Sequence, residues 1–251
     1  MKKQLFLYLT LSICLFAACK KDDPDPGPSC TPANRVAGES DNTGYHDNRT
    51  YDTKERIVKI ERGNSSFTTF VYEPNKVISD ITYNSNGTIV TLHQVFALEN
   101  GFAAQEIWTF SDGSPGRRYE YLRDSAHRPI EVLQFDDDNN LEFRTTYEYD
   151  VAGNRVKEFT YKSDGALRDI VLYEYALSIA NTLHYGDEFL RPDPKFVATK
   201  ITHTDQIIGY YDIQDFAYEK DAAGCIIKST VSRSFPDPSQ NYTRVTEYTY
   251  R

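Results

Sequence analysis

A short unit repeats along most of this chain and restricts what the chain can fold into. In each copy an aromatic residue opens a polar turn, Gly or Asn stands four places on, and an apolar residue then begins a new run. The spacing is clearest for Tyr149 with Gly153 and for Tyr161 with Gly165. Gly and Asn tolerate the positive φ that tight hairpin turns require. The repeat therefore predicts one antiparallel strand and one turn in each unit.

The runs between the turns alternate apolar and polar residues. Residues 141–149 read Leu-Glu-Phe-Arg-Thr-Thr-Tyr-Glu-Tyr, which is the period-2 pattern of a half-buried strand. The chain holds 19 Tyr and 14 Phe but one Trp and one Met, and this composition favours strands. We predict a mainly β fold of roughly a dozen strands, an antiparallel meander of repeated hairpins that forms a curved open sheet. A closed barrel and a two-sheet sandwich are the alternatives.

One segment, near residues 176–195, interrupts the period. The alternation is missing from Ala176 onward, and Leu177, Ala180 and Leu183 have the spacing of one helix face. The residues that follow are rich in Asp and Pro, which is typical of a loop. We predict a short helix-bearing insertion here. Such an insertion either caps an edge or the mouth of the sheet, or carries a binding site.

The N-terminal residues have the features of an export and anchoring signal. Lys2 and Lys3 precede an apolar run that ends at Ala18, and Cys19 follows directly. The run is too short for a membrane-spanning helix, which needs about 20 residues. The segment resembles a bacterial lipoprotein signal peptide. The resemblance implies that residues 1–18 are removed and that Cys19 carries fatty acyl chains such as palmitate, which anchor the protein in a membrane.

Residues 19–48 are predicted to form an acidic, Pro- and Gly-rich tether between the anchor and a β-repeat domain at 49–251. Few large apolar residues occur in this stretch, so it cannot bury enough surface to offset its ordering entropy. Its first residues, Lys20 to Asp25, resemble the export signal of Bacteroidota surface lipoproteins. That resemblance implies an outer-membrane location with exposure at the cell surface, and a periplasm-facing position is the alternative.

Residues 147–156 resemble the YD, or Rhs-type, repeat. The match consists of Tyr147, Tyr149 and Asp150, followed by Gly153 and Asn154. In long Rhs proteins such hairpins wind into a strip that encloses a cavity. Together with the lipoprotein signal, the repeat is similar to uncharacterised surface lipoproteins of Bacteroidota that contain a domain of unknown function. Neither resemblance implies an activity.

Two cysteines are candidates for a disulfide. Cys14 leaves with the signal peptide and Cys19 is the expected lipidation site, so Cys30 and Cys225 remain. An exported protein meets an oxidising compartment, where such a pair can form a bridge. The alternative is a free thiol in the tether and a half-buried thiol in a strand.

Composition and motifs argue against several classes of activity. The formal net charge is −9 and no basic stripe is present, so nucleic acid is not an expected partner. The five histidines are scattered, and neither a zinc-binding pattern, a nucleophile elbow nor a Walker loop occurs. We predict no metal, no cofactor, no catalytic residue and no enzymatic activity.

The tyrosines suggest what the domain binds. The residues at 147 and 149, and those at 173 and 175, project in pairs from one strand face, where most are expected to form core. Tyr185 and Tyr210 lie near the insertion and are predicted to contact a ligand. We therefore predict a non-enzymatic surface binding module for a glycan, a peptide or an envelope protein. A structural envelope protein is the alternative, and a glycan-active enzyme is less favoured.

Overall fold

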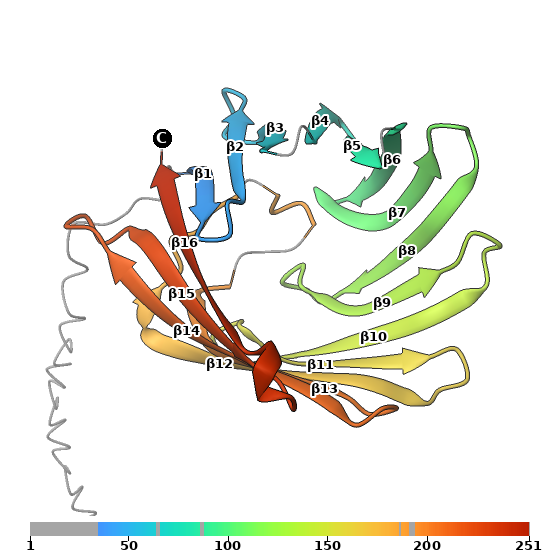
Figure 1. Cartoon of the computed structure of the whole chain (residues 1–251). Helices are drawn as coiled ribbons and strands as arrows, with labels where there is room; N and C mark the ends of the chain where they lie inside the picture. Colours follow the sequence, from blue (N-terminus) through green and yellow to red (C-terminus); the bar gives the residue numbers. More distant parts are fainter. Residues whose placement is uncertain (1–34, 64–65, 86–87, 186, 191–193, 251) are drawn as a thin grey trace, which may run out of the picture.

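The chain forms one closed antiparallel β-barrel (Figure 1). The computed structural model describes residues 35–63, 66–85, 88–185, 187–190 and 194–250. Each strand pairs with the next one in sequence, and the first strand pairs with the last. A 3-10 helix, Pro238–Gln240, precedes the last strand. The sixteen strands are β1 (Val36–Asp41), β2 (His46–Tyr51), β3 (Ile57–Arg62), β4 (Phe67–Glu73), β5 (Lys76–Ser85), β6 (Thr88–Glu99), β7 (Phe102–Phe110), β8 (Pro115–Arg123), β9 (Pro129–Phe135), β10 (Leu141–Tyr149), β11 (Arg155–Lys162), β12 (Leu167–Ala180), β13 (Phe196–Asp205), β14 (Tyr210–Lys220), β15 (Ile226–Ser234) and β16 (Tyr242–Tyr250).

The pairing of β1 with β16 corrects two expectations. Gly38 lies opposite Thr249, and Asp41 lies opposite Thr246, so the sheet is a closed barrel and the predicted open sheet is wrong. Strands β1 and β2 also occupy much of the predicted tether, so the barrel begins at Val36 rather than at residue 49. These two strands are poor in large apolar residues. Their ladders on both sides within the ring supply the hydrogen bonds that stabilise them.

Aspartates at the starts of the turns explain the sequence repeat. The Oδ1 atom of Asp150 accepts the backbone N–H groups of Ala152 at 2.9 Å and Asn154 at 2.8 Å. The third residue after the aspartate, Gly153, adopts a φ of 93°. This is a type I turn followed by a left-handed residue, the usual form of a three-residue hairpin loop. The same side-chain contacts recur at Asp41, Asp52, Asp124 and Asp221.

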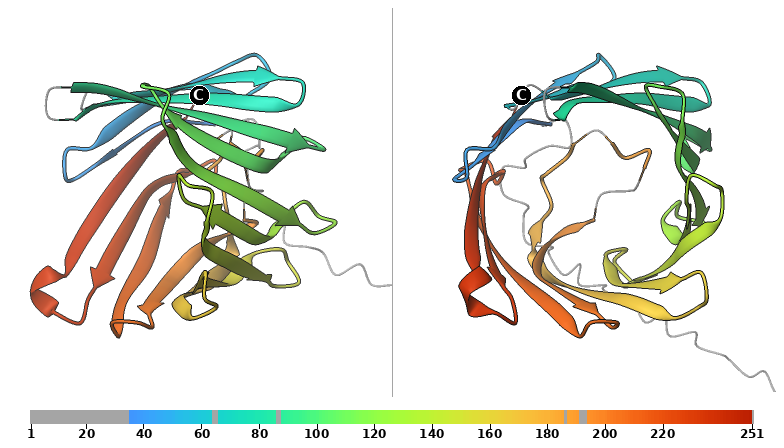
Figure 2. Two further views of the ribbon diagram at one scale, coloured as in Figure 1. Left: turned by 90° about the vertical axis from the view of Figure 1, so that its right-hand side faces the viewer. Right: turned by 45° about the vertical axis from the view of Figure 1, so that its right-hand side comes forward.

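The two ends of the barrel differ. Residues 181–185, 187–190 and 194–195, which lie between β12 and β13 in the chain, cross the interior of the ring and are called the crossing segment (Figure 2). We call the end with this segment the crossed end. The opposite end, where β13 joins β14 and β15 joins β16, is called the open end. A buried cluster of Val77, Phe96 and Ala103 packs against Phe189 and Leu190 of the crossing segment, so the apolar core lies toward the crossed end.

The short helix predicted near residues 176–195 is wrong. Strand β12 continues to Ala180, and the described residues between β12 and β13 contain turns and irregular structure but no helix. Some of their backbone groups bond to the barrel wall. The Ala103 N–H donates to the Phe189 carbonyl at 2.8 Å, and the Val36 N–H donates to the His184 carbonyl at 3.1 Å. Among the described residues, no helix has the length and apolar character needed to cross a bilayer.

The outer face of the barrel carries charged pairs. Glu148 lies between Tyr147 and Tyr149, which both line the interior, so its side chain faces outward. Its carboxylate lies 3.0 Å from the ammonium group of Lys157 on β11. Lys228 on β15 lies 2.7 Å from Glu219 on β14, which follows another interior tyrosine. Apolar side chains such as Leu172 share this face, so the outer wall is mixed rather than uniformly apolar.

Candidate functional site

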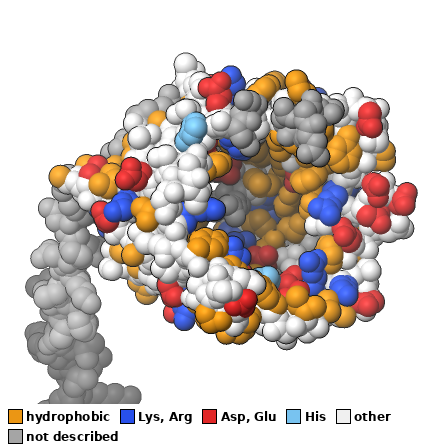
Figure 3. Space-filling view, in the orientation of Figure 1, with side chains coloured by type: hydrophobic (Ala, Val, Ile, Leu, Met, Phe, Trp, Pro, Cys, Tyr) orange, Lys and Arg blue, Asp and Glu red, His pale blue; other side chains and the backbone are white. Residues whose placement is uncertain are grey.

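The lumen contains a cavity of about 440 Å³ near the crossed end. The space-filling view shows the hollow that leads into the interior (Figure 3). Strands β8 to β14 and the crossing segment supply its walls. Tyrosine is the most frequent residue in the lining, and these tyrosines are Tyr121, Tyr147, Tyr149, Tyr173, Tyr175, Tyr185 and Tyr218.

The hydroxyl groups of three of these tyrosines donate hydrogen bonds to backbone carbonyls of the neighbouring strand. The hydroxyl of Tyr149 donates to the carbonyl of Pro129 at 2.6 Å. Tyr175 and Tyr218 donate in the same way, at 2.8 Å each, to carbonyls at or near the starts of β11 and β13. A buried hydroxyl needs such a partner. Because the hydroxyls are satisfied by the wall, the ring faces are the part of these residues that a ligand in the cavity would meet.

Arginines stack on the cavity tyrosines. The Arg155 guanidinium lies 4.6 Å from the ring centroid of Tyr173 and 3.3 Å from the carboxylate of Glu158. Burial opposes the charge of Arg155, but the neighbouring Tyr173 and Glu158 outweigh it and raise the pKa of this group above its ordinary value. Arg128 stacks on Tyr149 at 4.6 Å. The sequence analysis did not single out either arginine. Each one follows a turn that begins with an aspartate, Asp124 for Arg128 and Asp150 for Arg155, and this position was the available signal.

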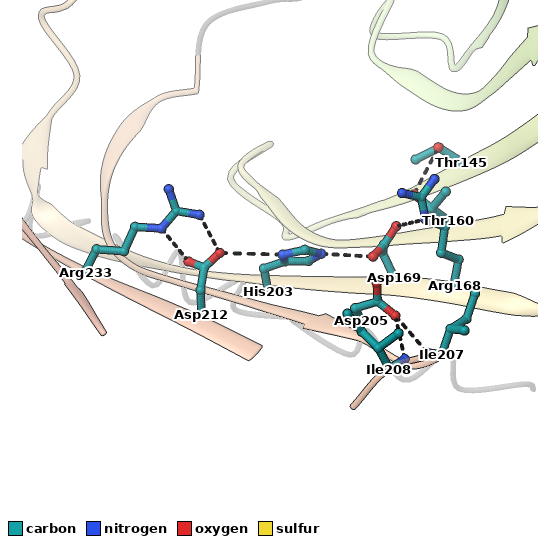
Figure 4. Close-up of polar contacts among 10 residues, drawn as sticks. All are labelled: Thr145, Thr160, Arg168, Asp169, His203, Asp205, Ile207, Ile208, Asp212 and Arg233. Atoms are coloured by element: carbon teal, nitrogen blue, oxygen red, sulfur yellow. Dashed lines mark hydrogen bonds and ion pairs between the residues drawn. The ribbon is translucent and has the colours of Figure 1, made fainter. Parts of the chain in front are cut away.

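A second polar group crosses the inner wall nearer the open end (Figure 4). Asp169, His203 and Asp212 come from β12, β13 and β14. The His203 Nε2 atom lies 3.0 Å from Asp169, and its Nδ1 atom lies 3.6 Å from Asp212. Arg233 on β15 donates to both oxygens of Asp212, at 3.1 and 2.7 Å. Four adjacent strands thus place alternating acidic and basic groups in one row, which we call the charged row.

Replacing Asp212 with asparagine is expected to remove about 2 kcal/mol of stability at neutral pH. Burial raises the pKa of Asp212, but hydrogen bonds from Arg233 and Gln214 outweigh it and leave the pKa below its ordinary value. The carboxylate therefore stabilises the fold above the pKa of the unfolded chain, and this stability is lost as pH falls through the folded value. Urea denaturation should show a difference between wild type and Asp212→Asn that is largest near neutrality and shrinks below about pH 4. A difference that does not change with pH would contradict this expectation.

The structure separates the residues for which a ligand contact was predicted. Tyr185 lies in the crossing segment and lines the cavity, with the Arg49 guanidinium 4.6 Å from its ring. Tyr210 opens β14 at the other end of the barrel, so the two do not form one site. Cys225 is disulfide-bonded. Cys19 and Cys30 lie outside the described residues, so lipidation and the Cys30–Cys225 bridge stay predictions.

No metal-binding group stands out in the part of the chain that the structure describes. Three or more His, Cys, Asp or Glu side chains do not converge there in a way that could hold an ion. The charged row comes nearest, but its histidine nitrogens face carboxylates with which they pair.

Comparison with known proteins identifies the fold. No family model matches the chain, and no curated protein matches it. A porin-like protein from Bacteroides uniformis is 14% identical, with a TM-score of 0.65 over 88% of this chain and 98% of that one. A porin-like protein from Bacteroides vulgatus is 13% identical, with a TM-score of 0.58 over 86% of this chain and 99% of that one. The chain therefore has a barrel fold similar to that of these two porin-like proteins.

Proposed function

We propose that this protein is a non-enzymatic binding module, held at the outer membrane by lipid on Cys19, whose barrel stands in water and takes a ligand into its lumen. The observation that carries the proposal is the placement of charge and aromatic rings. Charged pairs such as Glu148 with Lys157 lie on the outer wall, whereas seven tyrosines line the interior cavity. A barrel embedded in lipid instead has a continuous apolar band on its outer wall, which the charged pairs interrupt here.

The energetic cost of lipid contact supports a water-facing wall. A lysine or arginine on the lipid face of a barrel costs about 2–4 kcal/mol at the bilayer midplane. The outer wall of this barrel carries several such groups. One is Arg144, whose guanidinium lies 2.5 Å from the carboxylate of Glu131 on β9. A lipid anchor needs no apolar wall, because its acyl chains provide the membrane affinity. The lipid and the tether would then attach the protein to the membrane, and the barrel would bind the ligand.

The cavity favours a ligand with flat faces and polar edges. The tyrosine rings offer apolar faces, while Asn181, Arg155 and Asp187 offer polar contacts in the same lining. Both a glycan and a peptide have this character. Catalysis of glycan hydrolysis normally needs two facing carboxylates, and Asp187 is the one acidic residue among the described residues that line the cavity.

A purely structural role has less support. Such a role through strand addition would require an exposed sheet edge. Every strand of this barrel is paired on both sides, so the described residues present no edge of that kind.

Filling the cavity is expected to abolish binding. Ile201 lines the cavity from β13, and Ile201→Trp would occupy space that the ligand needs. The full chain, purified in a detergent without sugar head groups, would be applied to a combined glycan and peptide array. We expect wild type to bind members of one class and Ile201→Trp to lose at least tenfold in affinity for them, which corresponds to about 1.4 kcal/mol.

The neighbouring residue gives a matched control. Thr202 follows Ile201 on the same strand and therefore points to the outer wall. Thr202→Trp adds the same side chain outside the lumen and should bind like wild type. Failure of wild type to bind any glycan or peptide, or equal binding by Ile201→Trp, would refute the lumenal site and favour the structural role.

A further inference from the structure

Three aromatic side chains lie together at the open end, away from the tyrosine cavity. Tyr210 opens β14, Phe235 follows β15, and Tyr242 opens β16. The ring centroids of Tyr210 and Phe235 are 6.2 Å apart, and those of Phe235 and Tyr242 are 6.1 Å apart. We call these three residues the rim aromatics. They form a short line of rings across three adjacent strands.

The register places the rim aromatics on the inner face. Asp212 belongs to the inner charged row, and Tyr210 lies two positions before it on β14, so it shares that face. Tyr242 is paired with Arg233, another member of the row. Tyr242 is 41% exposed, so its ring is accessible to a ligand that enters the open end.

Arg233 joins the rim aromatics to the charged row. Its guanidinium lies 5.0 Å from the ring centroid of Phe235, and its Nη1 atom donates to the Tyr242 hydroxyl at 3.2 Å. The double hydrogen bond to Asp212 fixes the orientation of this arginine. The rings and the polar groups below them are therefore held in one arrangement before any ligand arrives, which reduces the entropy lost on binding.

The charges indicate what kind of molecule fits. An anionic ligand would meet the carboxylates of Asp169 and Asp212, and a cationic ligand would meet the guanidinium of Arg233. The printed hydrogen bonds use three of the five N–H groups of Arg233, and a wholly apolar ligand would cover the others without giving them a partner, which is costly. A neutral molecule with many hydroxyl groups and flat C–H faces satisfies both parts of the surface. Sugar rings have this combination of properties.

We propose that the rim aromatics and the charged row form a subsite for a neutral oligosaccharide, which stacks its rings on Tyr210, Phe235 and Tyr242. Its hydroxyl groups then accept hydrogen bonds from the N–H groups of Arg233 that Asp212 and Tyr242 do not bind. This inference rests on the proposed binding function and assigns the ligand class. The ligand enters at the open end, so a chain bound at the rim can extend toward the tyrosine cavity.

Single substitutions in the rim test the subsite. Calorimetric titration of the full chain, in a detergent without sugar head groups, would use neutral hexasaccharides of β-1,4-glucose, β-1,4-N-acetylglucosamine, α-1,4-glucose and α-1,6-mannose. At least one should bind with a Kd below about 1 mM. Tyr210→Ala and Tyr242→Ala should each weaken that binding by about tenfold, whereas Tyr210→Phe, which keeps the ring, should bind within about twofold of wild type.

Tyr211 provides the matched control for position 210. It is the next residue on β14, 42% exposed and on the outer face, so Tyr211→Ala removes an equal side chain outside the lumen. It should bind like wild type, and a thermal melt of each variant checks that the barrel is intact. The subsite is refuted when no hexasaccharide binds wild type, or when Tyr210→Ala binds as tightly as Tyr211→Ala. A peptide ligand that Ile201→Trp excludes, found without any sugar binding, would overturn the subsite and leave the proposed function in place.

Discussion

Replacing Glu106 with leucine is expected to lower the free energy of unfolding by about 3 kcal/mol or more. The Glu106 side chain is 5% exposed and lies on β7. It accepts hydrogen bonds from the Tyr121 hydroxyl at 2.6 Å, from the Gln94 amide at 3.0 Å and from the Trp108 ring N–H. Leucine would leave all three donors without a partner inside the barrel wall. Equilibrium urea denaturation of both proteins measures the difference.

Glutamine at the same position separates the hydrogen bonds from the charge. Burial raises the pKa of Glu106 above its ordinary value, and hydrogen bonds from Tyr121 and Trp108 offset only part of this. Because the folded pKa is the higher one, ionisation of this carboxyl destabilises the fold as pH rises above the unfolded pKa. Glu106→Gln should therefore gain stability relative to wild type as pH rises above the ordinary glutamate pKa of about 4.3. A leucine variant as stable as wild type, or a glutamine variant with no such trend, would contradict this account.

Replacing Phe189 with alanine is expected to cost about 3 kcal/mol. Its ring meets those of Phe96 and Tyr72 edge-on, with centroids 5.2 and 6.2 Å away and interplanar angles of 74° and 89°. Phe189 thus joins the crossing segment to the buried cluster on β5 to β7. Alanine would leave a void between the segment and the wall. Thermal and urea denaturation should both show the loss.

Leu177 supplies the control for Phe189. It lies near the end of β12, at the start of the region where a helix was predicted, and it is 67% exposed. Leu177→Ala should change the free energy of unfolding by less than about 0.5 kcal/mol. Equal losses for the two variants would show that Phe189 contributes nothing beyond an exposed apolar residue.

The hairpins could be predicted from the sequence because their causes are local. Asp150 and Gly153 fix a turn through contacts within five residues, and the alternation in β10 sets which side chains share a face. Closure could not be predicted in this way. It depends on pairing between β1 and β16, which are about 200 residues apart, and no local pattern encodes that register.

Two predictions from local sequence, the tether at residues 36–41 and the helix near residue 176, were wrong for identifiable reasons. The segment Val36–Asp41 contains Gly, Glu, Ser and Asp, a composition typical of a tether, yet it is a strand because both neighbours in the ring pair with it. The residues after Tyr175 lost the period-2 pattern because β12 contains irregularities there and then leads into the lumen. Tertiary pairing outweighed local composition in both cases.

The candidate site was predicted in part. The paired tyrosines at 147 and 149, and at 173 and 175, were expected to share a face and mostly to form core, whereas the structure places all four in the cavity lining. Tyr185 lines the same cavity from a segment without a helix, and its contact with a ligand stays a prediction. The charged row could not be predicted, because Asp169, His203 and Arg233 come from separate strands that only the barrel register aligns.

The closing ladder between β1 and β16 has a consequence for protein engineering. Val36 lies opposite Tyr250, so a short linker could join the ends of the barrel and new termini could be opened at another hairpin. Such a circular permutant would keep every strand neighbour it has now. The order of the strands is therefore a cycle, and the place where the polypeptide is cut is not what defines the fold.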